Sequence, residues 1–153
     1  MNESSEIVVS DLPLVVRRTA RWADCDPAGA VFTGRFADYL LGAVMHFMRK
    51  IGYGAGGQAG RESGIDLPCK HMSLTFHVSL YPEDVVDIQV CVGEIRTRTF
   101  DLVAQARLPD GRLAFEGVFT PISIHHGLRE SAEIPPSLRA LLTPHLLAKE
   151  ESA

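Results

Sequence analysis

Residues 22–36 read Trp-Ala-Asp-Cys-Asp-Pro-Ala-Gly-Ala-Val-Phe-Thr-Gly-Arg-Phe, and they combine two acids, a bend and the start of a helix. The Pro-Ala-Gly sequence after Asp26 predicts a tight bend, because Pro and Gly both favour turns. Apolar side chains then recur at three- and four-residue spacing as far as Ile51, which predicts a helix beginning near Thr33. The stretch therefore predicts that Asp24 and Asp26 lie beside a helix N-terminus, whose free N–H groups and partial positive charge can stabilise an anion.

Outside this stretch the chain is mostly typical of β-structure. Alternating apolar and basic residues predict a strand over 14–22, before the bend. Four more strands are predicted over residues 71–79, 85–95, 99–108 and 113–124, with Pro121 indicating an edge or bulge. Two prolines, 135 and 136, predict the start of a C-terminal helix over 137–147. One long helix cannot bury its apolar stripe alone, so we expect an α+β fold in which a curved antiparallel five-stranded sheet wraps it.

The totals predict one domain over residues 1–153, since a 46% hydrophobic composition suffices for one core. Residues 1–10 are expected to form a loose leader and residues 148–153 a solvated tail. No apolar run approaches the roughly 20 residues that cross a bilayer, and no signal pattern begins the chain. Three cysteines without framework spacing indicate reduced thiols. We therefore expect a cytoplasmic protein with no membrane partner.

Two further patterns argue against nucleic-acid binding and against dinucleotide binding. The formal net charge of −4 argues against a nucleic-acid partner, which usually selects a basic surface. Residues 52–64 are rich in glycine and begin with a Gly-x-Gly-x-x-Gly sequence that formally matches the dinucleotide fingerprint. That fingerprint needs a strand before it, whereas this one follows a helix. We therefore interpret residues 52–64 as a mobile loop or a short, poorly formed helix.

The segment Asp24-Cys-Asp-Pro-Ala-Gly-Ala-Val-Phe-Thr-Gly-Arg-Phe36 resembles the active-site segment of the 4-hydroxybenzoyl-CoA thioesterase family of hotdog-fold proteins. The family pattern is roughly Asp-x-Asp-x-x-Gly-x-Val, followed by aromatic residues and then Gly-Asn-Tyr at the opening of the helix. The resemblance extends over about residues 15–124, with the same order of strands and helix. It implies a hotdog fold and the hydrolysis of an acyl-CoA to the free acid and CoA, with water as the only cosubstrate and no cofactor.

Within this resemblance the family's catalytic carboxylate falls on Asp26. The residue that offers its backbone N–H to the thioester carbonyl falls on Thr33. Asp26 is implied either to attack the carbonyl as a nucleophile or to activate water as a general base, and both remain open. Gly34 is implied to keep the approach to the helix open. Asp24 and Gly29 are expected to be structural at the site, with Asp24 tying the bend through backbone hydrogen bonds.

Substrate contacts are implied at two further places. Phe36 stands where the family has Tyr, after Arg35 in place of the usual Asn, so Phe36 is expected in a pocket for an aromatic or a short to medium aliphatic acyl group. Family members often place basic residues here against the CoA phosphates, and the resemblance carries that role to Arg96 first and to Arg98 second. A pair of arginines suits phosphate, although two solvated charges on a hairpin would give the same pattern.

Other chemistry has less support in the sequence. The histidines lack a third ligand at metal-binding spacing, so we expect no metal. The neighbouring carboxylates should raise the pKa of Cys25 and make it a poor nucleophile. A hotdog hydratase normally has a His a few residues after the Asp, and residues 27–35 contain none. A non-catalytic acyl-CoA-binding module is the alternative of a different class, but it would have no use for Asp26.

The family resemblance also implies a homo-oligomer. Members work as dimers with the active site at the junction of two subunits, and dimers often pair into tetramers. A lone hotdog domain leaves a sheet edge and a pocket incomplete, which favours the same expectation.

Overall fold

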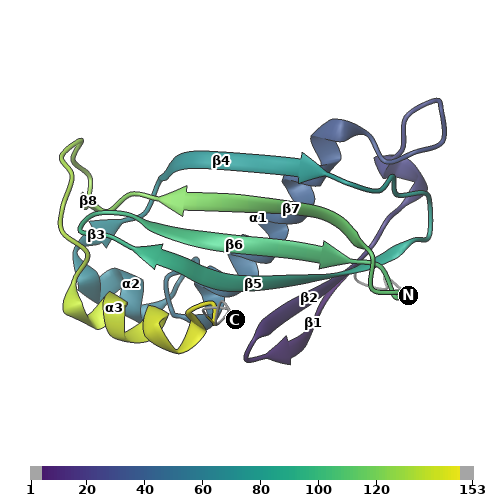
Figure 1. Cartoon of the computed structure of the whole chain (residues 1–153). Helices are drawn as coiled ribbons and strands as arrows, with labels where there is room; N and C mark the ends of the chain where they lie inside the picture. Colours follow the sequence, from purple (N-terminus) through teal and green to yellow (C-terminus); the bar gives the residue numbers. More distant parts are fainter. Residues whose placement is uncertain (1–4, 149–153) are drawn as a thin grey trace.

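The computed structural model describes residues 5–148, in which one long helix packs against an antiparallel sheet (Figure 1). The sheet has six strands in the order β1 (Glu6–Asp11), β2 (Leu14–Thr19), β5 (Val85–Ile95), β6 (Phe100–Arg107), β7 (Leu113–Pro121) and β4 (Cys69–Phe76). A two-stranded sheet pairs β3 (Ile65–Asp66) with β8 (Ile124–His125). The helices are α1 (Thr33–Lys50), α2 (Gln58–Ser63) and α3 (Pro136–Leu142), with short 3-10 turns η1 (Trp22–Asp24) and η2 (Thr143–His145). The predicted α+β class is confirmed.

The core lies between α1 and the face of the sheet that it covers. The three- and four-residue spacing places one stripe of α1 inward, and its buried members are Phe36, Tyr39, Leu40, Ala43, Val44, Phe47 and Met48. Alternate residues of β5 and β6 meet this stripe, among them Ile88, Val90, Leu102 and Ala104, which are at most 1% exposed. Gly52 ends the helix with a φ of 82°, as its position after the stripe predicts. The periodicity of the sequence thus accounts for the main packing contact.

The N-terminal part of the chain corrects the prediction of a loose leader over residues 1–10. Residues 6–11 form β1, which pairs antiparallel with β2 from Glu6 opposite Arg18 to Asp11 opposite Leu14. The sheet therefore has six strands and not five. Ile7, Val8 and Val9 are all exposed on this edge strand, so the segment shows none of the apolar–polar alternation by which a strand is recognised. Residues 1–4 and most of the predicted tail, 149–153, lie outside the described residues.

Prolines also shift two predicted boundaries. The C-terminal helix predicted over 137–147 ends at Leu142 and continues only as η2, because Pro144 has no N–H to donate to the carbonyl four residues before it. The strand predicted over 113–124 is divided. Pro121 ends β7, and residues 124–125 form β8, which pairs with a different partner, β3. A proline cannot donate to a strand ladder, which explains the break.

Two edges of the large sheet differ in what covers them. The other edge strand, β4, has no neighbouring strand on its outer side within residues 5–148, and all of its residues except Leu74 are exposed (Figure 1). Met72 and Phe76 of this strand are 41% and 46% exposed, which is unusual for apolar side chains on an unpaired edge.

No helix within residues 5–148 is long and apolar enough to cross a membrane.

Candidate active site

The loop between η1 and α1 is a closed bend with a hydrogen-bonded neck. Cys25 and Val31 form an antiparallel bridge, and the Asp26 N–H donates to the Ala30 carbonyl at 2.8 Å. Gly29 turns the chain with a φ of 86°, a left-handed value that residues with a Cβ adopt only with strain. The two arms of the bend therefore lie side by side, in keeping with the structural role expected of Gly29.

The Asp26 side chain is oriented within this bend but retains a free oxygen. Its Oδ1 accepts a hydrogen bond from the Ala28 N–H at 2.9 Å, an interaction typical of an Asp that begins a turn. Its Oδ2 has no hydrogen-bond donor within residues 5–148, and the residue is half-buried. One carboxylate oxygen is thus fixed by the backbone while the other stays available to a substrate.

The second arm of the bend delivers the start of α1. The Phe32 N–H donates to the Asp24 carbonyl at 2.8 Å, and no side chain caps the helix at Phe32. The N–H groups of Thr33 and Gly34 have no acceptor in the described part of the chain, and both residues are exposed. Helix N-termini normally have a polar side chain at this position, so the open first turn is notable. The bend therefore carries a carboxylate on its first arm and ends its second arm with two free N–H donors and a partial positive charge.

The aromatic residues around the start of α1 bear on the roles expected of Gly34 and Phe36. A Cβ on Gly34 would lie 2.8 Å from the Phe32 ring, so Gly34 makes room for that ring as well as for a substrate. Phe36 is only 6% exposed and packs against Phe115 and Phe76, with ring centroids 5.3 and 4.9 Å away. Since Phe76 lies on the exposed edge strand β4, this aromatic cluster reaches the surface there.

Asp24 is the buried acid of the pair. Its Oδ2 accepts hydrogen bonds from the Tyr39 hydroxyl at 2.8 Å and the Arg21 N–H at 3.0 Å. Burial by itself would raise the pKa of Asp24, but the Arg21 N–H, the Tyr39 hydroxyl and the charges of Arg18 and Arg35 together hold it below its ordinary value. Asp24 thus remains ionised and ties η1 and α1 to the neck of the bend. Sequence reasoning expected backbone bonds here, but did not foresee Tyr39.

Replacing Asp24 with Asn should lower the free energy of unfolding near neutral pH by about 1–3 kcal/mol, because a charged acceptor is lost from a buried network. The pKa of Asp24 is lowered in the folded state, so its contribution is present above the ordinary Asp pKa and is lost as the pH falls through the folded value. The difference between the wild type and Asp24→Asn should therefore be constant above about pH 5 and shrink from about pH 5 to about pH 2 in urea denaturation. A difference that stays constant over this range would contradict this account.

Cys25 lies between the two acids and is not a candidate nucleophile. Burial, followed by the charges of Asp24 and Asp26, raises the pKa of its thiol, as the sequence predicted. Its Sγ instead donates to the Arg21 carbonyl at 3.4 Å. All three cysteines are free thiols.

The predicted arginine pair lies on the hairpin between β5 and β6, and its members differ. Every guanidinium nitrogen of Arg96 already donates to the chain: Nε to Thr99, Nη1 to Glu94 and Asp101, and Nη2 to Asp101. The Asp101 and Glu94 carboxylates raise the pKa of Arg96, against the effect of burial. Arg98 is exposed, and its side chain has no partner within residues 5–148. Arg98 is therefore the member with donors to spare.

Two basic residues that sequence reasoning missed lie near this hairpin. Arg139 of α3 donates to the Arg96 carbonyl, and Lys70 of β4 lines a hollow of about 400 Å³ together with His71 and Arg96. The residues come from three distant parts of the sequence, so no local pattern joins them. The result is a locally basic region on an acidic chain.

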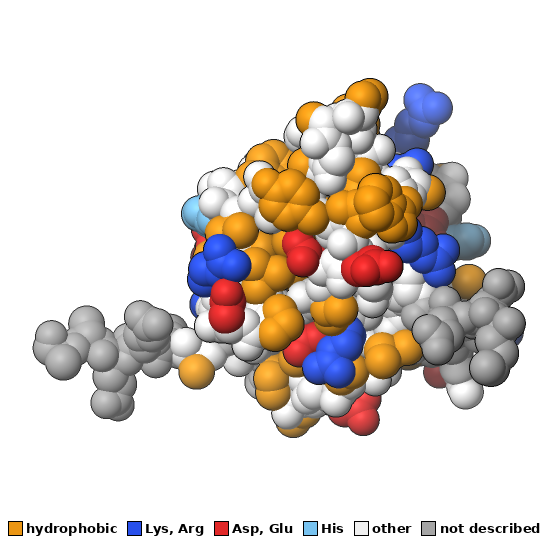
Figure 2. Space-filling model, turned by 90° about the vertical axis from the view of Figure 1, so that its right-hand side faces the viewer, with side chains coloured by type: hydrophobic (Ala, Val, Ile, Leu, Met, Phe, Trp, Pro, Cys, Tyr) orange, Lys and Arg blue, Asp and Glu red, His pale blue; other side chains and the backbone are white. Residues whose placement is uncertain are grey.

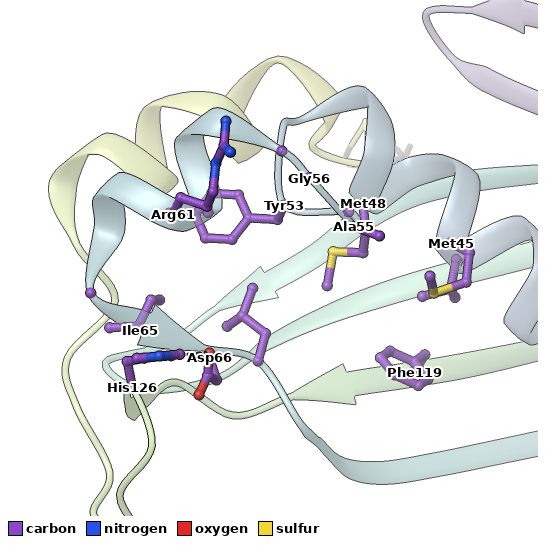
Figure 3. A pocket seen from close by; sticks show the side chains of 16 residues that line it. Met45, Met48, Tyr53, Ala55, Gly56, Arg61, Ile65, Asp66, Phe119 and His126 are labelled. Atoms are coloured by element: carbon purple, nitrogen blue, oxygen red, sulfur yellow. Dashed lines mark hydrogen bonds and ion pairs between the residues drawn. The ribbon is translucent and has the colours of Figure 1, made fainter.

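A larger hollow of about 480 Å³ lies under the glycine-rich segment (Figure 3). Met45 and Met48 of α1 and Phe119 of β7 form apolar walls, and Asp66 and His126 form an ion pair of 3.0 Å at its rim. The segment over residues 52–64 contains the short helix α2, one of the two forms that the sequence predicted. Its glycines also permit close packing. A Cβ on Gly57, for example, would lie 2.2 Å from the Gly52 carbonyl oxygen.

The bend and the two hollows lie at opposite ends of the domain. Thr33 and Met48 are fifteen residues apart on one helix, which corresponds to roughly 22 Å at the usual rise. Figure 1 shows the bend at the β4 arrowhead end and the hairpin of Arg96 at the other end. The face at the bend end carries acidic side chains among hydrophobic ones (Figure 2), and exposed aromatic residues of the bend region include Trp22 and Phe32.

Comparison with known proteins identifies the family. The model of the thioesterase-like superfamily matches residues 20–142, which include the bend, α1 and all of the large sheet except β1 and β2. The chain belongs to this superfamily. Membership places it among the thioester hydrolases and confirms the hotdog fold that the resemblance of residues 24–36 implied.

Solved structures similar to this superfamily member share its fold. A thioesterase superfamily protein from Jannaschia sp. CCS1 has a TM-score of 0.78 and 24% identity, covering 91% of this chain and 96% of its own. A gentisyl-coenzyme A thioesterase has a TM-score of 0.70 and 22% identity, covering 84% and 98%. A mutant 4-hydroxybenzoyl-CoA thioesterase in complex with 4-hydroxybenzoyl-CoA has a TM-score of 0.73 and 20% identity, covering 91% and 99%. No curated protein sequence matches the chain.

Proposed function

We propose that this superfamily member is an acyl-CoA thioesterase in which Asp26 is the catalytic carboxylate. The observation that carries the proposal is the hydrogen-bonded neck of the bend, which has Asp26 on its first arm and leads by its second arm to the uncapped N–H groups of Thr33 and Gly34. A thioester carbonyl oxygen at this helix start would accept those N–H groups and be stabilised as negative charge develops on it. The free Oδ2 of Asp26 faces no competing donor in the described chain.

Two courses of reaction fit this arrangement. In one, an Asp26 oxygen attacks the carbonyl carbon, the carbon–sulfur bond breaks and CoA leaves as the thiolate, giving a mixed anhydride that water hydrolyses. In the other, Asp26 takes a proton from a water molecule that attacks the same carbon directly. Both give the free acid and CoA. The Thr33 N–H is the proposed oxyanion donor in either case.

The proposed acyl group is aromatic or a short to medium aliphatic chain. The apolar walls of the larger hollow and the aromatic cluster around Phe36 favour such groups. Asp38 pairs with Arg35 at 3.3 Å, and His46 pairs with Glu6 at 3.4 Å, so these side chains are already engaged. Two of the similar structures are thioesterases of aromatic acyl-CoA by their descriptions, which is consistent with the aromatic choice.

We further propose a homodimer formed through the β4 edges, with dimers able to pair into tetramers. An antiparallel pairing of two β4 strands would place the Cys69 end of one copy beside the Phe76 end of the other. It would also cover the exposed Met72 and Phe76. The basic hairpin and the larger hollow of one subunit would then approach the Asp26 bend of the other. One substrate could therefore contact all three, although the bend lies at the opposite end of its own subunit from the hairpin and the hollow. The free thiols favour the cytoplasm as the compartment.

In this arrangement Arg98 is the proposed phosphate ligand, while Arg96 holds the hairpin in shape. Arg98→Ala should raise the KM for acyl-CoA about tenfold, since a charge-assisted hydrogen bond is lost. The KM for the matching acyl-pantetheine ester, which lacks the nucleotide phosphates, should stay unchanged. Arg107→Ala, an exposed arginine near the far end of β6, is the matched control. Equal changes in KM for both esters would refute the phosphate role.

The proposed function is tested by following thiol release from a panel of aryl- and alkyl-CoA esters. We expect release with at least one ester and saturation kinetics. Binding of the esters without release of thiol would instead support an acyl-CoA-binding module. Addition of water to an enoyl-CoA, with no thiol released, would support a hydratase.

A further inference from the structure

Beneath the Asp26 bend lies a cluster of charged side chains for which neither mechanism above has a use. It comprises Glu6 of β1, Arg18 of β2, Asp24 of η1, and Tyr39 and His46 of α1. These residues come from four elements and meet where β1 begins and β2 ends. Buried charges are costly, and apolar residues of similar volume often stabilise a protein at least as well. The cluster therefore calls for an explanation other than stability.

We propose that Arg18 is a positioning residue for the reaction, which holds Asp24, and through it the Asp26 bend and the start of α1. This inference rests on the proposed thioesterase function. The Arg18 side chain is 16% exposed and lies between two carboxylates, 3.4 Å from Glu6 Oε1 and 3.7 Å from Asp24 Oδ2. Its guanidinium carbon stands 4.5 Å from the centre of the Tyr39 ring.

Arg18 is linked to the start of α1 through Tyr39 and Asp24. Tyr39, on which Arg18 lies, donates its hydroxyl to the same Asp24 oxygen that Arg18 faces. The Asp24 carbonyl in turn accepts the Phe32 N–H, directly before the free N–H of Thr33. A change at Arg18 is thereby transmitted to both arms of the bend, while Arg18 itself forms no hydrogen bond or ion pair with Asp26 or Thr33 within residues 5–148.

Glu6 fixes the other side of Arg18 and explains a glycine on α1. The Glu6 carboxylate lies against Gly42, where a Cβ would be 2.0 Å from Oε1, and His46 approaches Oε2 at 3.4 Å. Both ion pairs of Arg18 are longer than direct hydrogen bonds, so Arg18 acts by its charge more than by the geometry of its fork. A lysine at position 18 should then preserve most of the function.

Arg18→Met and Arg18→Lys distinguish positioning from simple structural support. With the best ester of the panel, Arg18→Met should lower kcat about tenfold or more with KM nearly unchanged, because the substrate contacts remain and only the reacting groups shift. Arg18→Lys should recover most of kcat. Arg17→Met, on the outer face of the same strand and paired with Asp87, is the control and should leave kcat unchanged.

Gly42→Ala separates activity from stability, since Ala favours a helix interior more than Gly does. It should push Glu6 away from Arg18 and lower kcat several-fold while the melting temperature stays level or rises. Unchanged kcat in Arg18→Met would overturn the proposal. It would also be overturned if Arg18→Lys lost as much kcat and as many degrees of melting temperature as Arg18→Met does. An inactive wild type would contradict the proposed function itself, which is a distinct result.

Discussion

Replacing Asp26 with Asn should lower kcat for thioester hydrolysis by at least about a thousandfold, because the amide can neither attack the carbonyl nor take a proton from water. The fold should remain, since the amide oxygen of Asn can accept the Ala28 N–H as Asp26 Oδ1 does. KM should change little, because the N–H groups of the helix start and the proposed phosphate contacts are untouched. The measurement is steady-state thiol release, with the melting temperature recorded for each variant.

Asp110→Asn is the control for this experiment. Asp110 is an acid in a turn, like Asp26, and it too accepts a backbone N–H, here from Arg112 at 3.0 Å. It lies in the turn between β6 and β7, outside the proposed site. Its substitution should leave kcat within twofold or so of the wild type. If Asp26→Asn retained more than a few per cent of the wild-type kcat, Asp26 would not be the catalytic carboxylate.

Mixing inactive subunits should restore activity if the site is shared between two chains. Asp26→Asn lacks the carboxylate, and Arg98→Glu should repel CoA phosphates through a like charge. In a heterodimer of the two, one site combines Asp26 of one chain with Arg98 of the other. Random pairing of equal amounts should therefore restore about one quarter of the wild-type kcat/KM at low substrate concentration.

Mixing that restores no activity would contradict a site shared between two chains. If Asp26 and Arg98 of the same chain served one substrate, every site of the heterodimer would carry one defect, and mixing would restore nothing beyond the sum of the parents. Co-expression with two affinity tags isolates the heterodimer, and each homodimer purified in the same way is the control. Size-exclusion chromatography of all three also tests the dimer itself.

The sequence was sufficient for features that depend on neighbouring residues. The stripe of α1, the bend and the cap at Gly52 follow from local spacing and from the turn preferences of Pro and Gly, and the structure confirms them. The strand predicted over 85–95 coincides with β5 for the same reason. Resemblance over residues 24–36 added the hotdog fold, which local patterns alone left as an α+β arrangement.

Features that depend on distant residues could not be predicted in this way. The exposed apolar residues of β1 carry no alternation, and Glu6 becomes meaningful only when the fold brings it to Arg18 and Gly42. Even between residues only five positions apart, the engagement of Arg96 by Asp101 depends on the pairing of β5 with β6, and it makes Arg98 the proposed phosphate ligand in place of Arg96. Pairwise contacts across a sheet depend on register, which the sequence pattern specifies only weakly where a strand, such as β1, has no buried face.

The most direct test of the account is a side-by-side measurement of thiol release by the wild type, Asp26→Asn and Asp26→Ala on the best acyl-CoA ester. The account predicts rapid release by the wild type and nearly none by either variant, while calorimetry shows that Asp26→Asn still binds the intact ester. Hydrolysis that survives both substitutions, in proteins that melt like the wild type, would contradict the account.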